Sequence, residues 1–201
     1  MTSEPGLWNV ANVLTLVRIV LVPVFVACLL AGGTGWRLAA LAAFGVASLT
    51  DFFDGQLARS RGLVTDFGKI ADPVADKALT GAALICLSAL GELPWWVTGV
   101  IMFRELGVTA LRFWVIRWGV IPASRGGKAK TLLQVIAICL YVLPASLSPP
   151  EIVRELFMAA AVVATVVTGV DYVFQAVRLR RSGPAPEPAA GPARVSGSGE
   201  A

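Results

Sequence analysis

The sequence predicts an all-α membrane protein with six transmembrane helices. Of its 201 residues 56% are hydrophobic, and only 15% are charged, well below the roughly 25% of soluble globular proteins. Apolar runs recur with lengths close to the ~20 residues that a helix needs to cross a bilayer. Lysine and arginine gather in alternate connections between these runs, which is typical of a polytopic protein with a fixed orientation.

Turn-forming residues divide the first half of the chain into three expected helices. The first, 10–30, is almost purely apolar and ends before the Gly-Gly pair at 32–33. The second, 36–57, begins with a tryptophan and runs into an acidic motif. The third, 70–90, starts within that motif and stops before Gly-Glu-Leu-Pro at 91–94. Glycine and proline at these points favour turns over helix.

Three more helices are expected in the second half. The fourth, 95–116, opens with two tryptophans, and the fifth, 129–146, follows Arg-Gly-Gly at 125–127. The sixth, 152–179, follows Ser-Pro-Pro at 148–150 and ends in an arginine-rich stretch. No internal repeat divides the chain further.

The predicted organisation has three parts. Residues 1–8 are expected to form a short interfacial segment, and 9–181 the six-helix catalytic domain. Residues 182–201 are rich in Pro, Gly, Ala and Ser, so they cannot bury enough apolar surface to fold and are expected to be a disordered cytoplasmic tail. The first apolar run lacks a basic flank, which favours a retained span over a removed signal peptide.

The basic residues predict the orientation. Two cations, Arg37 and Arg154, fall on one side of the predicted helices. The other side carries eleven, namely Arg59, Arg61, Lys69, Arg117, Arg125, Lys128, Lys130, Arg178, Arg180, Arg181 and Arg194. By the positive-inside rule, both termini and the acidic motif are cytoplasmic, in a multi-pass protein of the cell membrane.

Composition also excludes several functions. The chain has no histidine, which rules out Ser-His-Asp catalysis and histidine-metal sites. No basic stripe with interleaved aromatic residues indicates a nucleic-acid partner.

Four aspartates form the acidic motif between the second and third expected helices. Asp51 and Asp54 are three residues apart, and Asp72 and Asp76 are four apart, so each pair shares a helix face. Two antiparallel helices can bring the pairs together. Unpaired intramembrane aspartate is costly, and carboxylate oxygens suit hard cations such as Mg²⁺ or Mn²⁺. The motif therefore predicts a site for two divalent ions, which would clamp a phosphoryl group during its transfer.

Small and basic residues surround these acids. Gly55, Ala58 and Gly68 leave room for a bulky ligand close to the backbone. Arg59 can donate two parallel hydrogen bonds to a phosphate.

The complete pattern, D-x-x-D-G-x-x-A-R, eight residues, then G-x-x-x-D-x-x-x-D, resembles the signature of the CDP-alcohol phosphatidyltransferases. The resemblance implies a six-helix membrane enzyme, often homodimeric, that moves a phosphatidyl group from CDP-diacylglycerol to an alcohol and releases CMP. It implies that the four aspartates hold two divalent ions and that Asp76 also deprotonates the alcohol. Gly55, Arg59 and Thr65 would contact the CDP portion.

Outside this motif the chain resembles the branch of that family formed by bacterial phosphatidylglycerophosphate synthases. Asn12, Thr15 and Arg18 match the opening N-x-L-T-x-x-R pattern of that branch, although Ala11 stands where a proline is frequent. Asn12 and Thr15 would then line the nucleotide pocket. The segments 104–112 and 127–131 are similar to the fourth helix and the start of the fifth.

The resemblance implies sn-glycerol 3-phosphate as the acceptor alcohol. Four basic residues would bind its phosphate: Arg104, Arg112, Lys128 and Lys130. For the two lysines, anchoring of the helix end at the cytoplasmic surface is an equally good explanation.

Three alternatives remain open. The acceptor can instead be inositol phosphate, or phosphatidylglycerol, although a lipid acceptor would not need several cations. A divalent-metal or proton transporter also carries intramembrane acids, but its acids should be spread across the depth of the membrane. A non-catalytic scaffold explains the hydrophobicity and leaves the acidic motif without a role.

Overall fold

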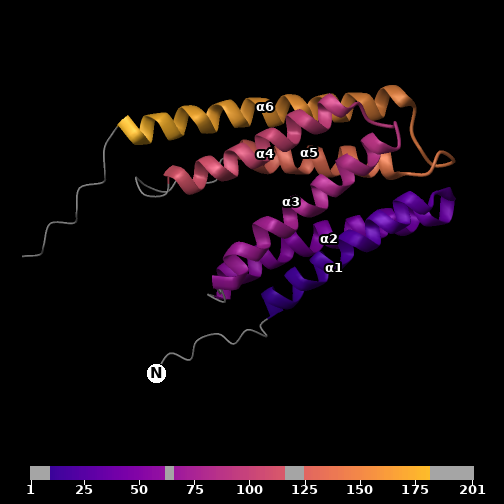
Figure 1. The fold of residues 1–201 in the computed structure, drawn as a ribbon, viewed down its shortest axis with the longest axis horizontal. Coiled ribbons are helices and arrows are strands. Elements are labelled where there is room, and N and C mark those ends of the chain that lie inside the picture. The colour runs from indigo at the N-terminus through magenta and orange to yellow at the C-terminus, as the bar shows by residue number, and fades with distance from the viewer. Residues whose placement is uncertain (1–9, 62–65, 116–124, 182–201) are drawn as a thin grey trace, which may run out of the picture.

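A computed structural model describes the backbone of residues 10–61, 66–115 and 125–181, and the side chains of 14–50, 77–115 and 126–180. The described residues are all-α, as predicted, and contain no strand. They form six helices (Figure 1), which are α1 (Val10–Ala31), α2 (Gly33–Arg61), α3 (Asp66–Ala89), α4 (Trp95–Val115), α5 (Arg125–Val142) and α6 (Glu151–Arg181).

The helices form two groups joined by α3. Helix α1 packs along α2, while α6 packs along both α4 and α5. Helix α3 crosses between the groups, contacting α1 on one side and α4 and α5 on the other (Figure 1). The end of α2, the start of α3, the end of α4, the start of α5 and the end of α6 all lie toward the left of Figure 1. The acidic motif and most of the basic residues therefore occupy the same end of the molecule.

Helix α3 ends in a Schellman motif, which explains the turn predicted at 91–94. Gly91 has a positive φ of 76°. Its N–H donates to the carbonyl of Ser88 at 3.1 Å, and the N–H of Glu92 donates to the carbonyl of Leu87 at 3.0 Å. This pairing satisfies carbonyls that a helix end otherwise leaves without partners, and it requires a left-handed residue that glycine adopts without strain.

Some helix ends differ from the sequence-based expectation. Helix α2 continues four residues further, to Arg61, and α3 begins four residues earlier, at Asp66. Helix α5 begins at Arg125, so the Arg-Gly-Gly segment lies in its first turn, and it ends at Val142. Its end is set by Pro144, which cannot donate a helical hydrogen bond and disfavours helical geometry in the residue before it.

Small side chains allow α2 to pack closely. Ala40, Ala43 and Ala47 recur at helical spacing and are buried. Between them Phe44 contacts Phe25 of α1, with ring centroids 5.6 Å apart. Without a hydrophobic driving force in lipid, such close backbone approach is a main source of helix association in membranes.

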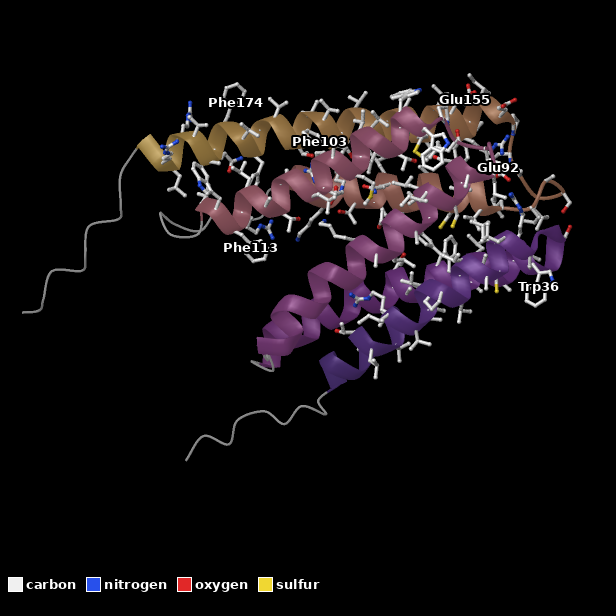
Figure 2. The ribbon with its side chains drawn as sticks, viewed as in Figure 1. Trp36, Glu92, Phe103, Phe113, Glu155 and Phe174 are labelled. Atoms are coloured by element: carbon white, nitrogen blue, oxygen red, sulfur yellow. The ribbon has the colours of Figure 1, made fainter. Side chains whose placement is uncertain are left out.

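The outer surface is apolar, as a lipid-facing surface must be. Phe103, Phe113 and Phe174 are 82%, 64% and 67% exposed, and the side chain of Phe174 points away from the bundle (Figure 2). Within the described residues, two helical segments are long and apolar enough to cross a membrane, Leu14–Ala31 and Glu151–Arg180.

One arginine joins three segments at the end opposite the acidic motif. Arg37 of α2 pairs with Glu92 in the α3–α4 turn. It also donates to the carbonyl of Leu143 at 3.2 Å, just past the end of α5. Trp36 and Glu92 both lie at this end of the bundle (Figure 2).

Candidate active site

The acidic motif lies on the two helices expected to carry it. Asp51 and Asp54 belong to the C-terminal part of α2, and Asp72 and Asp76 to the N-terminal part of α3. The two helices contact each other. The side chains of the four aspartates lie outside the described residues, so the four-carboxylate pocket stays a prediction.

The same holds for most of the predicted CDP-diacylglycerol contacts. The backbone of Gly55, Ala58 and Arg59 is helical in α2, and that of Gly68 in α3. Thr65 lies outside the described residues.

The N-terminal helix turns a polar face inward. Thr15 is 1% exposed and Arg18 is 0% exposed. They are three residues apart and so share a face of α1, the helix that packs against α2 and α3. Asn12 lies one turn earlier in α1, and its side chain is outside the described residues. The burial of Thr15 agrees with a place inside the bundle beside the motif-bearing helices.

The described residues contain a buried ionic cluster centred on Glu105 of α4. One carboxylate oxygen, Oε2, accepts a hydrogen bond from Lys77 Nζ of α3 at 2.6 Å. The other, Oε1, accepts from Lys130 Nζ of α5 and from Arg104 Nη1 at 3.0 Å. Glu105 is 9% exposed and Lys130 is 6% exposed. We call these four residues the Glu105 cluster; it joins three helices in the interior.

Two of the four predicted acceptor-binding residues meet in the Glu105 cluster, namely Arg104 and Lys130. The other two lie elsewhere. Arg112 is exposed, and its guanidinium carbon lies 5.9 Å from the ring centroid of Tyr172 in α6. Lys128 is exposed on α5. The four basic residues therefore do not form a single group in this structure.

Arg104 is also fixed to α6. Its Nε donates to the carbonyl of Thr165 at 3.1 Å, and its Nη2 donates to Thr168 Oγ1 at 2.7 Å. A Cβ on Gly169 would come within 2.9 Å of Arg104 Cγ. The glycine thus leaves the space that the arginine side chain fills.

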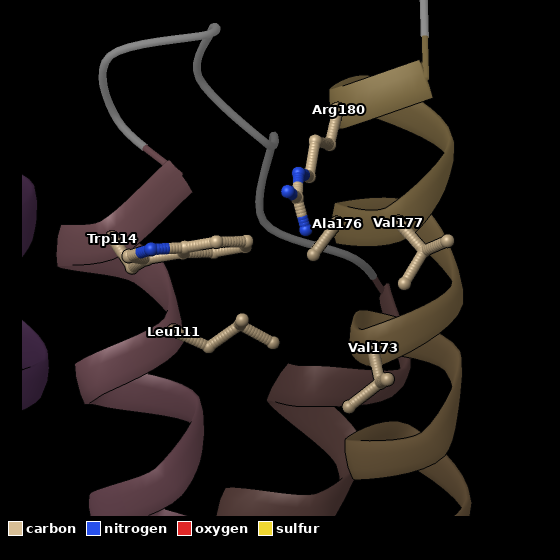
Figure 3. Close-up of a pocket in the computed structure, with 6 residues that line it drawn as sticks. All are labelled: Leu111, Trp114, Val173, Ala176, Val177 and Arg180. Atoms are coloured by element: carbon tan, nitrogen blue, oxygen red, sulfur yellow. The ribbon is translucent and has the colours of Figure 1, made fainter.

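A separate hollow lies between the C-terminal halves of α4 and α6 (Figure 3). Its volume is about 350 Å³. The guanidinium of Arg180 lies 5.2 Å from the ring centroid of Trp114, a cation–π geometry. The lining offers no carboxylate and no nucleophile, so it has no catalytic chemistry of its own; it consists of Leu111, Trp114, Val173, Ala176, Val177 and Arg180.

Lys77 was not among the site residues predicted from the sequence. A signal was present, because Lys77 directly follows Asp76 and stands at the start of the apolar part of its helix, Lys77–Ala89. A cation in such a position needs an anionic partner. Its partner, Glu105, is 28 residues away in the chain, so only the folded structure identifies the pair.

Residues 8–167 match the CDP-alcohol phosphatidyltransferase family, and the chain belongs to that family of polytopic membrane enzymes. The matched range contains the acidic motif and all members of the Glu105 cluster.

Individual relatives cover most of the chain. It is 57% identical over 173 residues to a "Probable phosphatidylglycerophosphate synthase" of Mycobacterium tuberculosis, covering 85% of this chain and 82% of the relative. It is 40% identical to a "CDP-diacylglycerol--glycerol-3-phosphate 3-phosphatidyltransferase" of Bacillus subtilis, covering 83% and 94%. A relative of the same name from Rickettsia felis is 37% identical, covering 82% and 93%.

Proposed function

We propose that the protein transfers the phosphatidyl group of CDP-diacylglycerol to sn-glycerol 3-phosphate, which yields phosphatidylglycerophosphate and CMP. The observation that carries the proposal is the complete acidic motif within the family match. The names of the relatives from M. tuberculosis and B. subtilis support glycerol 3-phosphate as the acceptor.

The donor set fits two divalent ions, Mg²⁺ or Mn²⁺. Asp51, Asp54, Asp72 and Asp76 offer only hard carboxylate oxygens, on two helices that contact each other, and such ligands suit these cations. Bound ions would neutralise the diphosphate charge and polarise the phosphoryl oxygens.

The residues of the chain would then bind, orient and move one proton. Arg59, Gly55 and Thr65 hold the CDP portion, helped by Ala58 and Gly68, which leave space for it, and by Asn12 and Thr15 of α1. Asp76 accepts the proton of the primary hydroxyl of glycerol 3-phosphate. The hydroxyl oxygen forms a bond to the phosphatidyl phosphorus, and the bond from that phosphorus to the CMP oxygen breaks.

The acceptor phosphate would bind to basic side chains of α4 and α5. Lys130 and Arg104 already lie side by side against Glu105. Arg112 of α4 and Lys128 of α5 lie apart from this pair. They stay proposed contacts of the acceptor phosphate. The dianionic phosphate of glycerol 3-phosphate suits a group of several cations better than the single negative charge of a lipid acceptor such as phosphatidylglycerol.

We also propose six membrane crossings with the acidic motif and both termini in the cytoplasm. The apolar outer surface and the two spanning segments support membrane insertion, and the uneven distribution of Lys and Arg supports the orientation.

The test is CMP release by the purified protein with Mg²⁺ or Mn²⁺, CDP-diacylglycerol and a panel of acceptors. We expect turnover with glycerol 3-phosphate, and little with inositol phosphate, phosphatidylglycerol or serine. Asp76→Asn should reduce turnover by about 10²-fold or more, because the proton acceptor is lost. Asp171→Asn is the matched control and should keep its activity, since Asp171 is exposed and, among the described residues, accepts a hydrogen bond from Gln175 of the same helix.

Turnover with another acceptor in place of glycerol 3-phosphate would reject the acceptor but keep the reaction class. Metal flux into proteoliposomes without CDP-diacylglycerol, together with no CMP release, would reject the reaction class itself.

A further inference from the structure

Glu105 has no part in the proposed reaction, although it is the centre of a buried ionic cluster. It is the meeting point of cations from α3, α4 and α5, and both of its oxygens are occupied. An ionised carboxylate offers about four acceptor positions, and three described donors use it. A buried acid this well satisfied holds its partners in fixed positions.

Two partners of Glu105 belong to segments that the proposed function assigns to the acceptor end of the reaction. Lys77 is the residue directly after Asp76, the proposed base. Lys130 comes from α5, in a segment proposed to bind the acceptor. Even without counting Lys77, Arg104 and Lys130 set two positive charges against one negative charge. The cluster therefore keeps a positive character that suits an anion while its geometry is fixed by the carboxylate.

We propose that Glu105 is a positioning residue, which holds Lys77 and Lys130 as a pair of cations for the phosphate of the acceptor alcohol. It contacts no reacting atom. Its carboxylate keeps two flexible lysine side chains in one conformation, so that less rotamer freedom is lost when the phosphate binds. Lys77 is thereby assigned as a further acceptor-binding residue. This inference rests on the proposed function.

The KM of the Glu105→Gln variant for glycerol 3-phosphate distinguishes a positioning role from a purely electrostatic one, because the two roles change this KM in opposite directions. If Glu105 only weakened the positive field, then its neutralisation would tighten anion binding and lower the KM for glycerol 3-phosphate. If Glu105 positions the lysines, its neutralisation lets like charges move apart and raises that KM.

The experiment compares Glu105→Gln with wild type at varied glycerol 3-phosphate and varied CDP-diacylglycerol. Glutamine keeps the shape and removes the charge. We expect the KM for glycerol 3-phosphate to rise about 10-fold or more, the size of one lost charge-assisted hydrogen bond. The KM for CDP-diacylglycerol should change less than about 2-fold. Glu105→Asp, which keeps the charge, should recover part of the loss.

The matched control is Glu92→Gln. Glu92 also pairs with a partly buried arginine, Arg37, but at the opposite end of the bundle. Both variants lose an ion pair, so both should lower the unfolding temperature, and only Glu105→Gln should change the KM for glycerol 3-phosphate. An unchanged or lowered KM in Glu105→Gln, or equal changes in both KM values, overturns the positioning role.

Two further measurements keep the proposal falsifiable if Glu105→Gln does not fold. Lys77→Gln leaves Glu105 paired with Lys130 and Arg104, and it should raise the same KM about 10-fold. Glycerol 3-phosphate alone, without CDP-diacylglycerol, should raise the unfolding temperature of the wild type. It should raise that of Lys77→Gln less. A Lys77→Gln enzyme with wild-type KM and wild-type stabilisation overturns the assignment. Wild-type protein that does not use glycerol 3-phosphate at all refutes the proposed function instead.

Discussion

At the scale of single residues, the structure gives the intramembrane charges specific partners. Arg104 donates to Glu105, to the Thr165 carbonyl and to the Thr168 hydroxyl. Charged groups inside a bilayer are costly unless they are paired in this way. Gly169 is part of the arrangement, because it leaves room for the arginine side chain. The predicted acceptor contact Arg104 therefore also connects α4 to α6.

Gly169→Ala should destabilise the protein, because its new Cβ would come within 2.9 Å of Arg104 Cγ. The arginine has to shift and lose geometry in its bonds to α6. We expect a loss of about 1–3 kcal/mol in the free energy of unfolding, measured by unfolding in detergent. Gly107→Ala on α4 is the control, since nothing lies within 4 Å of its added Cβ, and it should cause no loss. Equal losses in the two variants would contradict the role of Gly169.

At the scale of elements, the two faces of α2 show how one helix serves two environments. Ala40, Ala43 and Ala47 are buried, while Ala39 and Ala42 are exposed. The buried alanines let α1 and α2 approach closely. Because α2 continues into the acidic motif, its packing also determines where Asp51 and Asp54 are presented relative to α3.

Ala40→Leu should disturb this packing, because Ala40 is 0% exposed and three extra carbons have no space. Overpacking of this kind costs about 1–3 kcal/mol. Ala39→Leu introduces the same side chain on the exposed face of the same helix and should be neutral. Thermal unfolding in detergent distinguishes the two. An Ala40→Leu protein as stable as wild type would contradict close packing around Ala40.

At the scale of the whole molecule, the ends of the helices separate two kinds of surface. One end has Arg37 paired with Glu92 and the α3–α4 turn. The other end has the acidic motif, the end of α4, the start of α5 and the end of α6, and each of these three carries basic residues. A substrate with a lipid tail and a nucleotide head suits this second end, where the motif would face the cytoplasm.

The orientation can be measured with single cysteines in a background without Cys28, Cys86 and Cys139. Thr34→Cys, at the start of α2, and Lys128→Cys, at the start of α5, are both exposed positions. In inside-out vesicles a membrane-impermeant maleimide should label Lys128→Cys and not Thr34→Cys. Right-side-out vesicles should give the reverse pattern. Labelling of both from one side would refute an odd number of crossings between these positions.

Much of the fold was predictable because its signals are local. The helices follow from apolar runs, and Gly91 follows from the needs of a helix end. The ends near Arg61, Asp66 and Arg125 were not predictable, because charged and glycine-rich segments can continue a helix when tertiary packing favours it. The acidic motif was recognised from its spacing. Asp51 lies in the C-terminal part of α2 and Asp76 in the N-terminal half of α3, and the pocket that they would form stays a prediction.

The sequence alone determined the helical class, the acidic motif and the family, because hydropathy and fixed residue spacing are properties of neighbouring positions. Only the tertiary structure decided that Glu105 joins Lys77 to Lys130, and that Gly169 makes room for Arg104. Lys77 and Lys130 are 28 and 25 residues away from Glu105 in the sequence. Arg104 is 61 residues away from Thr165, its partner in α6. Such contacts depend on how each helix is rotated and packed against the others, which no local pattern specifies.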